Sequence, residues 1–157
     1  MKNNVYSQWI GFIGLGHILF QVLFILLNLS DLPEQIPTHF NASGKADGYG
    51  SPATLWMFPM LTFFISILLG VIASGSTFFT LKEPETEAIA EKTGALARKL
   101  LLYLSFIVSG IFSFATLHII STAKGIDLVP AHLILPMLLV LILGPVGWFV
   151  WKVRRVK

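Results

Sequence analysis

The stretch QWIGFIGLGHILFQVLFILLNL, residues 8–29, contains no lysine, arginine, aspartate or glutamate among its 22 residues. As an α-helix with a rise of ~1.5 Å per residue, it is long enough to cross the ~30 Å hydrocarbon layer of a bilayer. In that layer a helix satisfies its own backbone hydrogen bonds, which an irregular segment cannot do. The stretch therefore predicts a membrane-spanning helix.

Three further apolar segments follow at residues 54–81, 98–121 and 131–152, and none has a charged residue in its middle. Of the 157 residues, 55% are hydrophobic and 12% are charged, whereas soluble proteins average about 25% charged residues. A soluble domain of this size has too small an interior to bury so much apolar surface. The sequence predicts an all-α integral membrane protein, a bundle of four transmembrane helices forming one domain over residues 1–157.

The positive charge of the chain, +3 with a pI near 9.3, is unevenly distributed. If the four segments cross the membrane in alternating directions, nine of the eleven basic residues fall on one side: Lys2, Lys82, Lys92, Arg98, Lys99, Lys152, Arg154, Arg155 and Lys157. Cytoplasmic segments carry the excess of Lys and Arg. Both termini and the connection 82–97, expected to form a short helix running into the third span, are therefore predicted to be cytoplasmic. Orientation and contact with lipid headgroups account for the charge, so no nucleic-acid partner is predicted.

The first connection, which contains IPTHFNASGKADGYGSP at residues 36–52, is predicted to be a structured outward loop. Pro33 and Pro37 restrict the backbone and favour an extended course. Glycines permit the positive φ values of tight turns, and three of them stand in this loop: Gly44, Gly48 and Gly50. The sequence ADG favours a turn closed by the side chain of Asp47.

Three of the four histidines are predicted to meet at the outer face. His39 lies in the loop, His118 about one turn before the end of the third span, and His132 at the start of the fourth. Together with Asp47 they would offer the nitrogen and oxygen ligands that zinc prefers. Their spacing follows no zinc motif, however, and His118 and His132 can equally be interfacial residues bonded to backbone or water. No HExxH motif or nucleophile elbow occurs, so no catalytic residue is predicted.

Two polar features are expected inside the membrane. His17 lies in the middle of the first span, where an ionisable side chain either handles a proton or ligand or bonds to a neighbouring helix. Small residues four apart form stripes that allow helices to approach closely, and two such stripes occur: Ser66, Gly70 and Ser74 in the second span, and Ser105, Ser109 and Ser113 in the third. We expect these two stripes to face each other.

The loop LPEQIPTHFNASGKADGYGS, residues 32–51, resembles the signature of a bacterial membrane family. That family is named as a domain of unknown function and stands at the N-terminus of SdpI-type immunity proteins. Its pattern, LP-x-x-[IV]P-x-H-[FW]-[ND]-x-x-G-x-x-D-[GR]-[WY]-G-[ST], is matched at Leu32, Pro33, Ile36, Pro37, His39, Phe40, Asn41, Gly44, Asp47, Gly48, Tyr49, Gly50 and Ser51. The resemblance covers residues 10–65, and in this chain two further spans follow.

The resemblance implies a multispanning protein of the bacterial plasma membrane. SdpI-type proteins protect a producing cell from a secreted peptide toxin and can relay its presence by sequestering a repressor at the membrane. A cytoplasmic regulator is accordingly one implied partner.

Our preferred hypothesis is a non-enzymatic binding protein whose outer loop recognises an extracellular peptide, lipid headgroup or ion. The residues expected to contact the ligand are His39, Phe40, Asn41, Asp47 and Tyr49. Two alternatives stay open. One is a metal-dependent membrane enzyme or small transporter that uses the outer histidines, or His17, with zinc as its cofactor. The other is a loop that serves only to cap the helical bundle.

Overall fold

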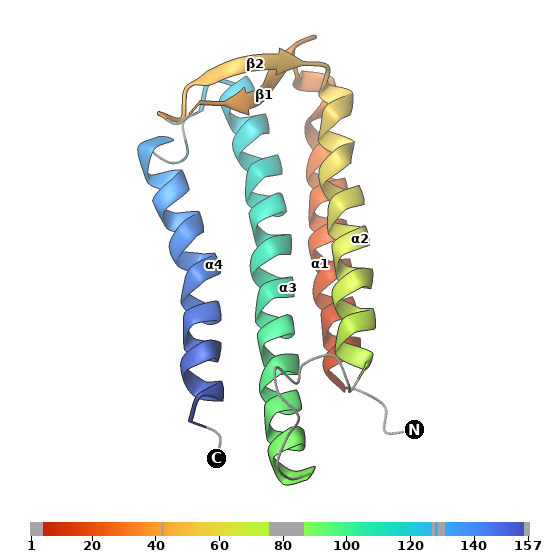
Figure 1. Cartoon of the computed structure of the whole chain (residues 1–157). Helices are drawn as coiled ribbons and strands as arrows, with labels where there is room; N and C mark the ends of the chain where they lie inside the picture. The colour runs from red at the N-terminus through yellow and green to blue at the C-terminus, as the bar shows by residue number, and fades with distance from the viewer. Residues whose placement is uncertain (1–4, 42, 76–86, 127, 129–130, 156–157) are drawn as a thin grey trace.

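The computed structural model describes residues 5–41, 43–75, 87–126, 128 and 131–155. Most of them are helical, and Figure 1 shows the helices standing side by side with a small hairpin across one end. The elements are α1 (Val5–Asn28), η1 (Leu29–Asp31), β1 (Ile36–Phe40), β2 (Ala46–Gly50), η2 (Pro52–Trp56), α2 (Met57–Ser74), α3 (Glu87–Ala123) and α4 (Ala131–Val153).

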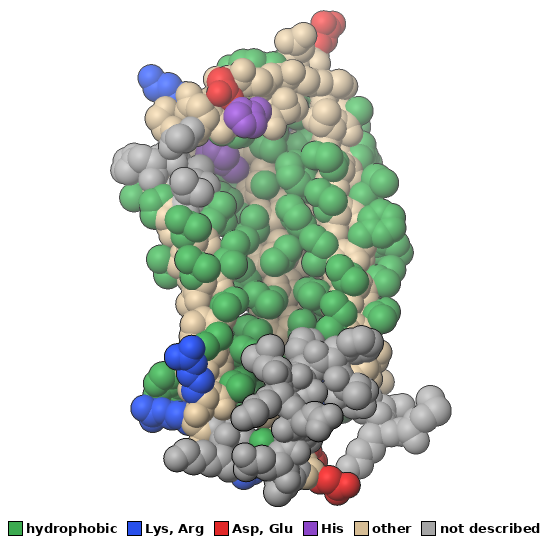
Figure 2. All heavy atoms as spheres, in the orientation of Figure 1, with side chains coloured by type: hydrophobic (Ala, Val, Ile, Leu, Met, Phe, Trp, Pro, Cys, Tyr) green, Lys and Arg blue, Asp and Glu red, His purple; other side chains and the backbone are tan. Residues whose placement is uncertain are grey.

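Four helical segments in the described residues are long and apolar enough to cross a membrane. Many of their large apolar side chains are exposed, such as Phe12, Phe64 and Val140. Hydrophobic side chains cover the middle of the molecule, while charged ones gather at its two ends (Figure 2). An exposed apolar surface of this extent is stable in lipid and not in water. The structure thus fits a multi-pass membrane protein.

The helix bounds differ from the sequence expectation in the second and third spans. Residues 52–56, expected in part to belong to the second span, form the 3-10 helix η2, whose first turn Ser51 caps by accepting a hydrogen bond from the amide of Ala53. Residues 76–81 of that expected span lie outside the described residues. The third helix begins at Glu87 and continues without a break to Ala123, so the described part of the connection 82–97 does run as a helix into the third span.

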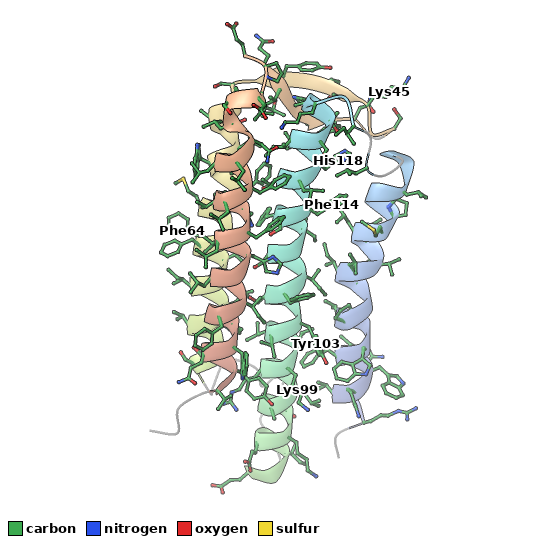
Figure 3. All side chains as sticks on the ribbon, turned by 180° about the vertical axis from the view of Figure 1, so that it is seen from behind. Lys45, Phe64, Lys99, Tyr103, Phe114 and His118 are labelled. Carbon is green, nitrogen blue, oxygen red and sulfur yellow. The ribbon has the colours of Figure 1, made fainter. Side chains whose placement is uncertain are left out.

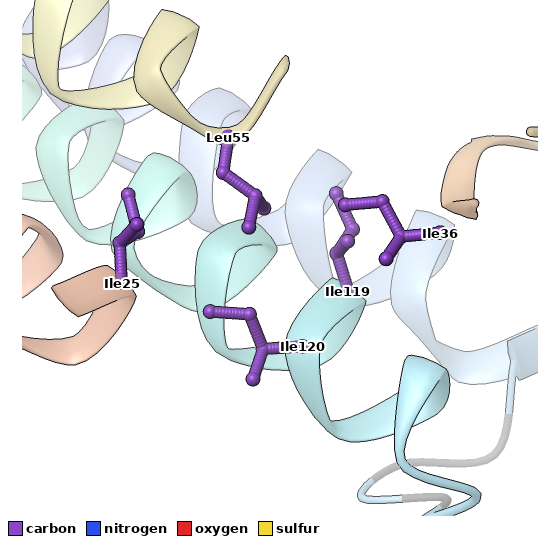
Figure 4. Packing of buried hydrophobic residues seen from close by; sticks show 5 residues of the cluster. All are labelled: Ile25, Ile36, Leu55, Ile119 and Ile120. Atoms are coloured by element: carbon purple, nitrogen blue, oxygen red, sulfur yellow. The ribbon is translucent and has the colours of Figure 1, made fainter. Parts of the chain in front are cut away.

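Helices α1, α2 and α3 pack against one another, whereas the main described neighbour of α4 is α3. The buried face of α1 carries Ile10, Gly14, Gln21 and Ile25, whose spacing places them on one side of a helix. Figure 4 shows one core cluster near the hairpin, formed by Ile25, Ile36, Leu55, Ile119 and Ile120. A second cluster, of Ile10, Ala73 and Leu101, lies towards the other end of these helices.

The small residues bring α2 and α3 close to α1. A Cβ atom added to Gly14 would lie 2.1 Å from Ser66 Oγ, and Ser113 Oγ lies 2.9 Å from His17 Nδ1. Although α2 and α3 also contact each other, these contacts of Ser66 and Ser113 are made with α1. The expectation that the two stripes face each other is therefore wrong at Ser66 and Ser113, whose side chains contact α1 instead.

The chain direction alternates from helix to helix. The hairpin, the end of α3 and the start of α4 lie at one end of the bundle, and the start of α1 and the end of α4 lie at the other (Figure 1). We call these the hairpin end and the terminal end.

Candidate functional site

The first connection contains a two-stranded antiparallel hairpin, β1–β2. Pro37 pairs with Tyr49 and His39 with Gly48, and the register shifts on both sides of His39. Such irregularities bend a strand and re-aim its side chains. Pro37 is buried in β1, while Pro33 is exposed in the segment that leads into it.

Asn41 closes the turn of the hairpin. Its Oδ1 accepts hydrogen bonds from the amides of Ser43 and Lys45, each at 3.0 Å, and from the Ser43 hydroxyl at 2.7 Å. The backbone N–H of Asn41 donates to the backbone carbonyl of Lys45 at 2.9 Å. The prediction that Asp47 closes the turn is wrong, because Asp47 lies within β2, after the turn has ended. Either side chain can form such a turn; the strand register places Asn41 at the corner.

The three loop glycines serve two different purposes. Gly44 has a φ of 75°, a left-handed conformation that glycine adopts without strain. Gly48 and Gly50 are not among the described residues with positive φ, so the prediction is wrong for them. They are small because of packing: an added Cβ would lie 2.9 Å from His39 Cβ at Gly48 and 3.1 Å from Thr38 Cγ2 at Gly50.

Two apolar side chains anchor β1 to the bundle. Ile36 is fully buried and belongs to the cluster with Ile25 and Leu55 (Figure 4). Phe40 packs on His118 with ring centroids 5.3 Å apart, and His118 stacks in turn on Phe114 at 5.8 Å. Figure 3 shows His118 and Phe114 on successive turns of α3 below the hairpin. The hairpin is therefore held against the helix ends by buried contacts on one side.

A polar clamp joins the helix ends under the hairpin. Lys124 Nζ donates to Asn28 Oδ1 at 2.7 Å and forms an ion pair with Asp31 at 3.3 Å. Asn28 also donates to the carbonyl of Phe24, one turn back. The clamp fixes the end of α3 relative to the end of α1.

Three of the five residues predicted to contact a ligand form an exposed patch. His39 Nδ1 lies 2.5 Å from Asp47 Oδ1, and these side chains are 72% and 44% exposed. Tyr49, two residues after Asp47 in β2, is 60% exposed, and alternation along a strand places these two on the same face. We call His39, Asp47 and Tyr49 the hairpin patch. Phe40 and Asn41 make contacts that hold the hairpin in shape, and their contact with a ligand stays a prediction.

The three histidines predicted to meet at the outer face differ in their surroundings. His39 is exposed, whereas His118 is 7% exposed and packed between two phenylalanines. His132 lies in the first turn of α4, but its side chain lies outside the described residues. Within the described part of the chain, no three His, Asp or Glu side chains come together as metal ligands. The zinc hypothesis, which includes His132, stays a prediction.

A polar cluster lies inside the bundle, away from the hairpin. Gln21 is fully buried and donates to Thr62 Oγ1 at 2.9 Å and to Ser113 Oγ at 3.1 Å. Ser113 also bonds to His17. These side chains join α1, α2 and α3, which is how polar groups in membrane helices usually act. Sequence reasoning identified His17 but missed Gln21, although their spacing of four residues places both on one helix face.

The comparison with protein families gives one match. Residues 17–63 match the family model described as Domain of unknown function (DUF1648). The matched segment is less than a third of the chain and runs from the middle of α1 through the hairpin into α2. No curated protein and no solved structure matches the chain.

Proposed function

We propose that the chain is a non-enzymatic binding protein of the bacterial plasma membrane, and that its hairpin patch recognises an extracellular ligand. The observation that carries the proposal is the division of the hairpin into two sets of residues. One set is used to build the hairpin and attach it to the helices, and the other remains exposed at the outer end.

The building set has evident structural roles. Ile36 and Phe40 anchor β1, Asn41 and Gly44 form the turn, and Gly48 permits close packing of the strands. These contacts are enough to give the hairpin a defined position. A loop that only capped the bundle would need no more than this set.

The hairpin patch adds little to stability. Even an exposed pair of opposite charges contributes only about 0–1 kcal/mol, and both side chains of the His39–Asp47 hydrogen bond are solvent-accessible. Tyr49 leaves more than half of its surface uncovered. Rigid support beneath an exposed polar and aromatic patch is the arrangement of a binding surface, since little conformational entropy is lost when a ligand binds.

The orientation supports an extracellular ligand. The terminal end carries most of the described basic residues, among them Lys92, Lys99 and Arg155, and basic residues favour the cytoplasmic side. The hairpin end would then face outward, with both termini in the cytoplasm. Binding outside could be relayed through the bundle to a cytoplasmic regulator.

A secreted peptide is the ligand class that we favour. The patch offers a carboxylate, an imidazole and a phenol, which suit the amide and amine groups of a peptide. The resemblance of residues 32–51 to the SdpI-type signature supports the same class and suggests immunity to a peptide toxin as the physiological role.

The test is protection of living cells. Cells expressing the wild type are challenged with a panel of secreted peptide toxins and compared with the variant His39→Ala/Asp47→Ala/Tyr49→Ala and with the control Glu34→Ala, an exposed residue outside the patch. We expect the triple variant to insert normally and lose protection, while the control keeps it. Full protection by an inserted triple variant would refute the proposal, as would no protection by the wild type against any peptide.

A further inference from the structure

A pocket at the terminal end has the composition of an anion site. It has a volume of about 430 Å³ and lies between α3 and the end of α4. Four of its seven lining residues are basic: Lys92, Lys99, Lys152 and Arg155. None of the seven is acidic, and no described carboxylate forms an ion pair with these four.

The pocket lies where a lipid headgroup would lie. Lys and Arg side chains gather at the terminal end beside α4 (Figure 2), below the apolar middle of the molecule. Figure 3 places Lys99 near that end of α3, with Tyr103 one turn closer to the hairpin. Tyr103 is 53% exposed, and tyrosine favours the boundary between headgroups and hydrocarbon. The basic side chains therefore lie at headgroup depth.

Tryptophans hold part of the basic set in place. The guanidinium of Arg155 lies 4.0 Å from the ring centroid of Trp151, a lining residue, and Lys152 Nζ lies 6.0 Å from that of Trp148. Cations are attracted to these ring faces. The contacts restrict two cations beside the pocket without neutralising their charge, so they stay available to an anion.

The surface next to the pocket can take acyl chains. α4 packs mainly on α3, and its exposed side chains include Leu143 and Val150. An anion without an acyl chain would use the basic residues alone, whereas a phospholipid would also cover this apolar surface. The continuity of charge and apolar surface favours the lipid.

We propose that this pocket binds the phosphate of an anionic phospholipid, with the acyl chains lying along α3 and α4. The lipid would fill the space between the terminal ends of these helices and strengthen the attachment of α4. This inference does not depend on the proposed function of the hairpin patch, because it concerns other residues at the opposite end.

The experiment follows thermal unfolding of the full chain in an uncharged detergent. The protein is titrated with phosphatidylglycerol, phosphatidylcholine or inorganic phosphate, for wild type, for Lys99→Gln/Lys152→Gln, and for a control that removes the same charge outside the pocket, Lys45→Gln/Arg154→Gln. Each basic residue near an anionic group contributes about fivefold in affinity. We expect phosphatidylglycerol to raise the unfolding temperature, and the pocket variant to need about 30-fold more of it. The control should need about as much as the wild type.

Several results would overturn the inference. Equal stabilisation by phosphatidylcholine would show that charge is not recognised. Equal weakening by the control variant would show a general effect of net charge. Equal stabilisation by inorganic phosphate would assign the pocket to a free anion. If the double variant does not fold, Lys99→Gln replaces it, with an expected weakening of about fivefold against Arg154→Gln.

Discussion

Asn41 and Asp47 stand six positions apart in the hairpin and have different roles. Asn41 is used by the turn, where its side-chain oxygen accepts three hydrogen bonds. Asp47 is exposed, and among the described residues the hydrogen-bonding partner of its side chain is His39. At the residue scale, the function proposed for the hairpin depends on this difference, since the exposed Asp47–His39 pair is accessible to a ligand while Asn41 is used by the turn.

The role of Asn41 can be tested by hydrogen exchange. Asn41→Ala removes the acceptor, and each net hydrogen bond contributes about 0.5–1.5 kcal/mol. We expect the amides of Ser43 and Lys45, which donate to it, to exchange about 2–13 times faster. Asn41→Asp keeps an acceptor oxygen and should exchange like the wild type. Unchanged exchange in the alanine variant would show that the turn forms without this side chain.

The roles of some of these residues could be predicted from the sequence, and those of others could not. His39, Asp47 and Tyr49 were identified from residue type and from the family signature, and they do form an exposed patch. The turn was assigned to Asp47 because Asp and Asn are equivalent in turn preference, and strand register alone distinguishes them. Gln21 was missed because one polar residue hardly changes an apolar run, and its partners Thr62 and Ser113 are distant in sequence.

At the scale of elements, the helices were predictable and the hairpin was not. Four apolar runs of sufficient length indicate four helices, and the structure has them. The hairpin is only five residues per strand and rich in glycine and proline, which weaken the strand signal. It forms because Ile36 and Phe40 pack against buried residues of α1, η2 and α3. Local periodicity in the sequence does not reveal such long-range packing.

The close packing of α1 on α2 at Gly14 predicts how a substitution there changes the free energy of unfolding. Gly14→Ala places a methyl group 2.1 Å from Ser66 Oγ, so we expect the unfolding free energy to fall by about 1–3 kcal/mol. Gly16→Ala, two positions along the same helix, meets nothing within 4 Å and is the matched control. Unfolding in mixed detergent micelles measures both.

A rescue variant separates this contact from a general effect on the helix. Adding Ser66→Gly to Gly14→Ala removes the side chain that the new methyl group meets. We expect the double variant to recover part of the lost stability. If Gly14→Ala and Gly16→Ala unfold alike, α1 and α2 are not as close at this point as the structure has them.

At the scale of the whole molecule, the two ends have different surfaces. The hairpin end has a supported hairpin with an exposed patch, and the terminal end has a basic pocket between α3 and α4. Between them lies a bundle in which α1, α2 and α3 are joined by buried polar contacts, while α4 is attached mainly to α3. Such a bundle can hold the hairpin rigidly, while α4, which is attached mainly to α3, can shift its position more easily.

The proposed role of the hairpin patch depends on how the bundle is oriented in the membrane. The charge distribution predicts that the terminal end is cytoplasmic. Because the chain contains no cysteine, single cysteines can be introduced at chosen positions without a background signal. Lys45 in the turn and Arg154 after α4 mark the two ends.

The most direct test of the outward-facing hairpin is therefore labelling of Lys45→Cys and Arg154→Cys in intact cells with a membrane-impermeant maleimide. We expect position 45 to be labelled in intact cells and position 154 only after the membrane is permeabilised. Labelling of position 154 but not of position 45 in intact cells would place the hairpin in the cytoplasm and contradict an extracellular binding surface.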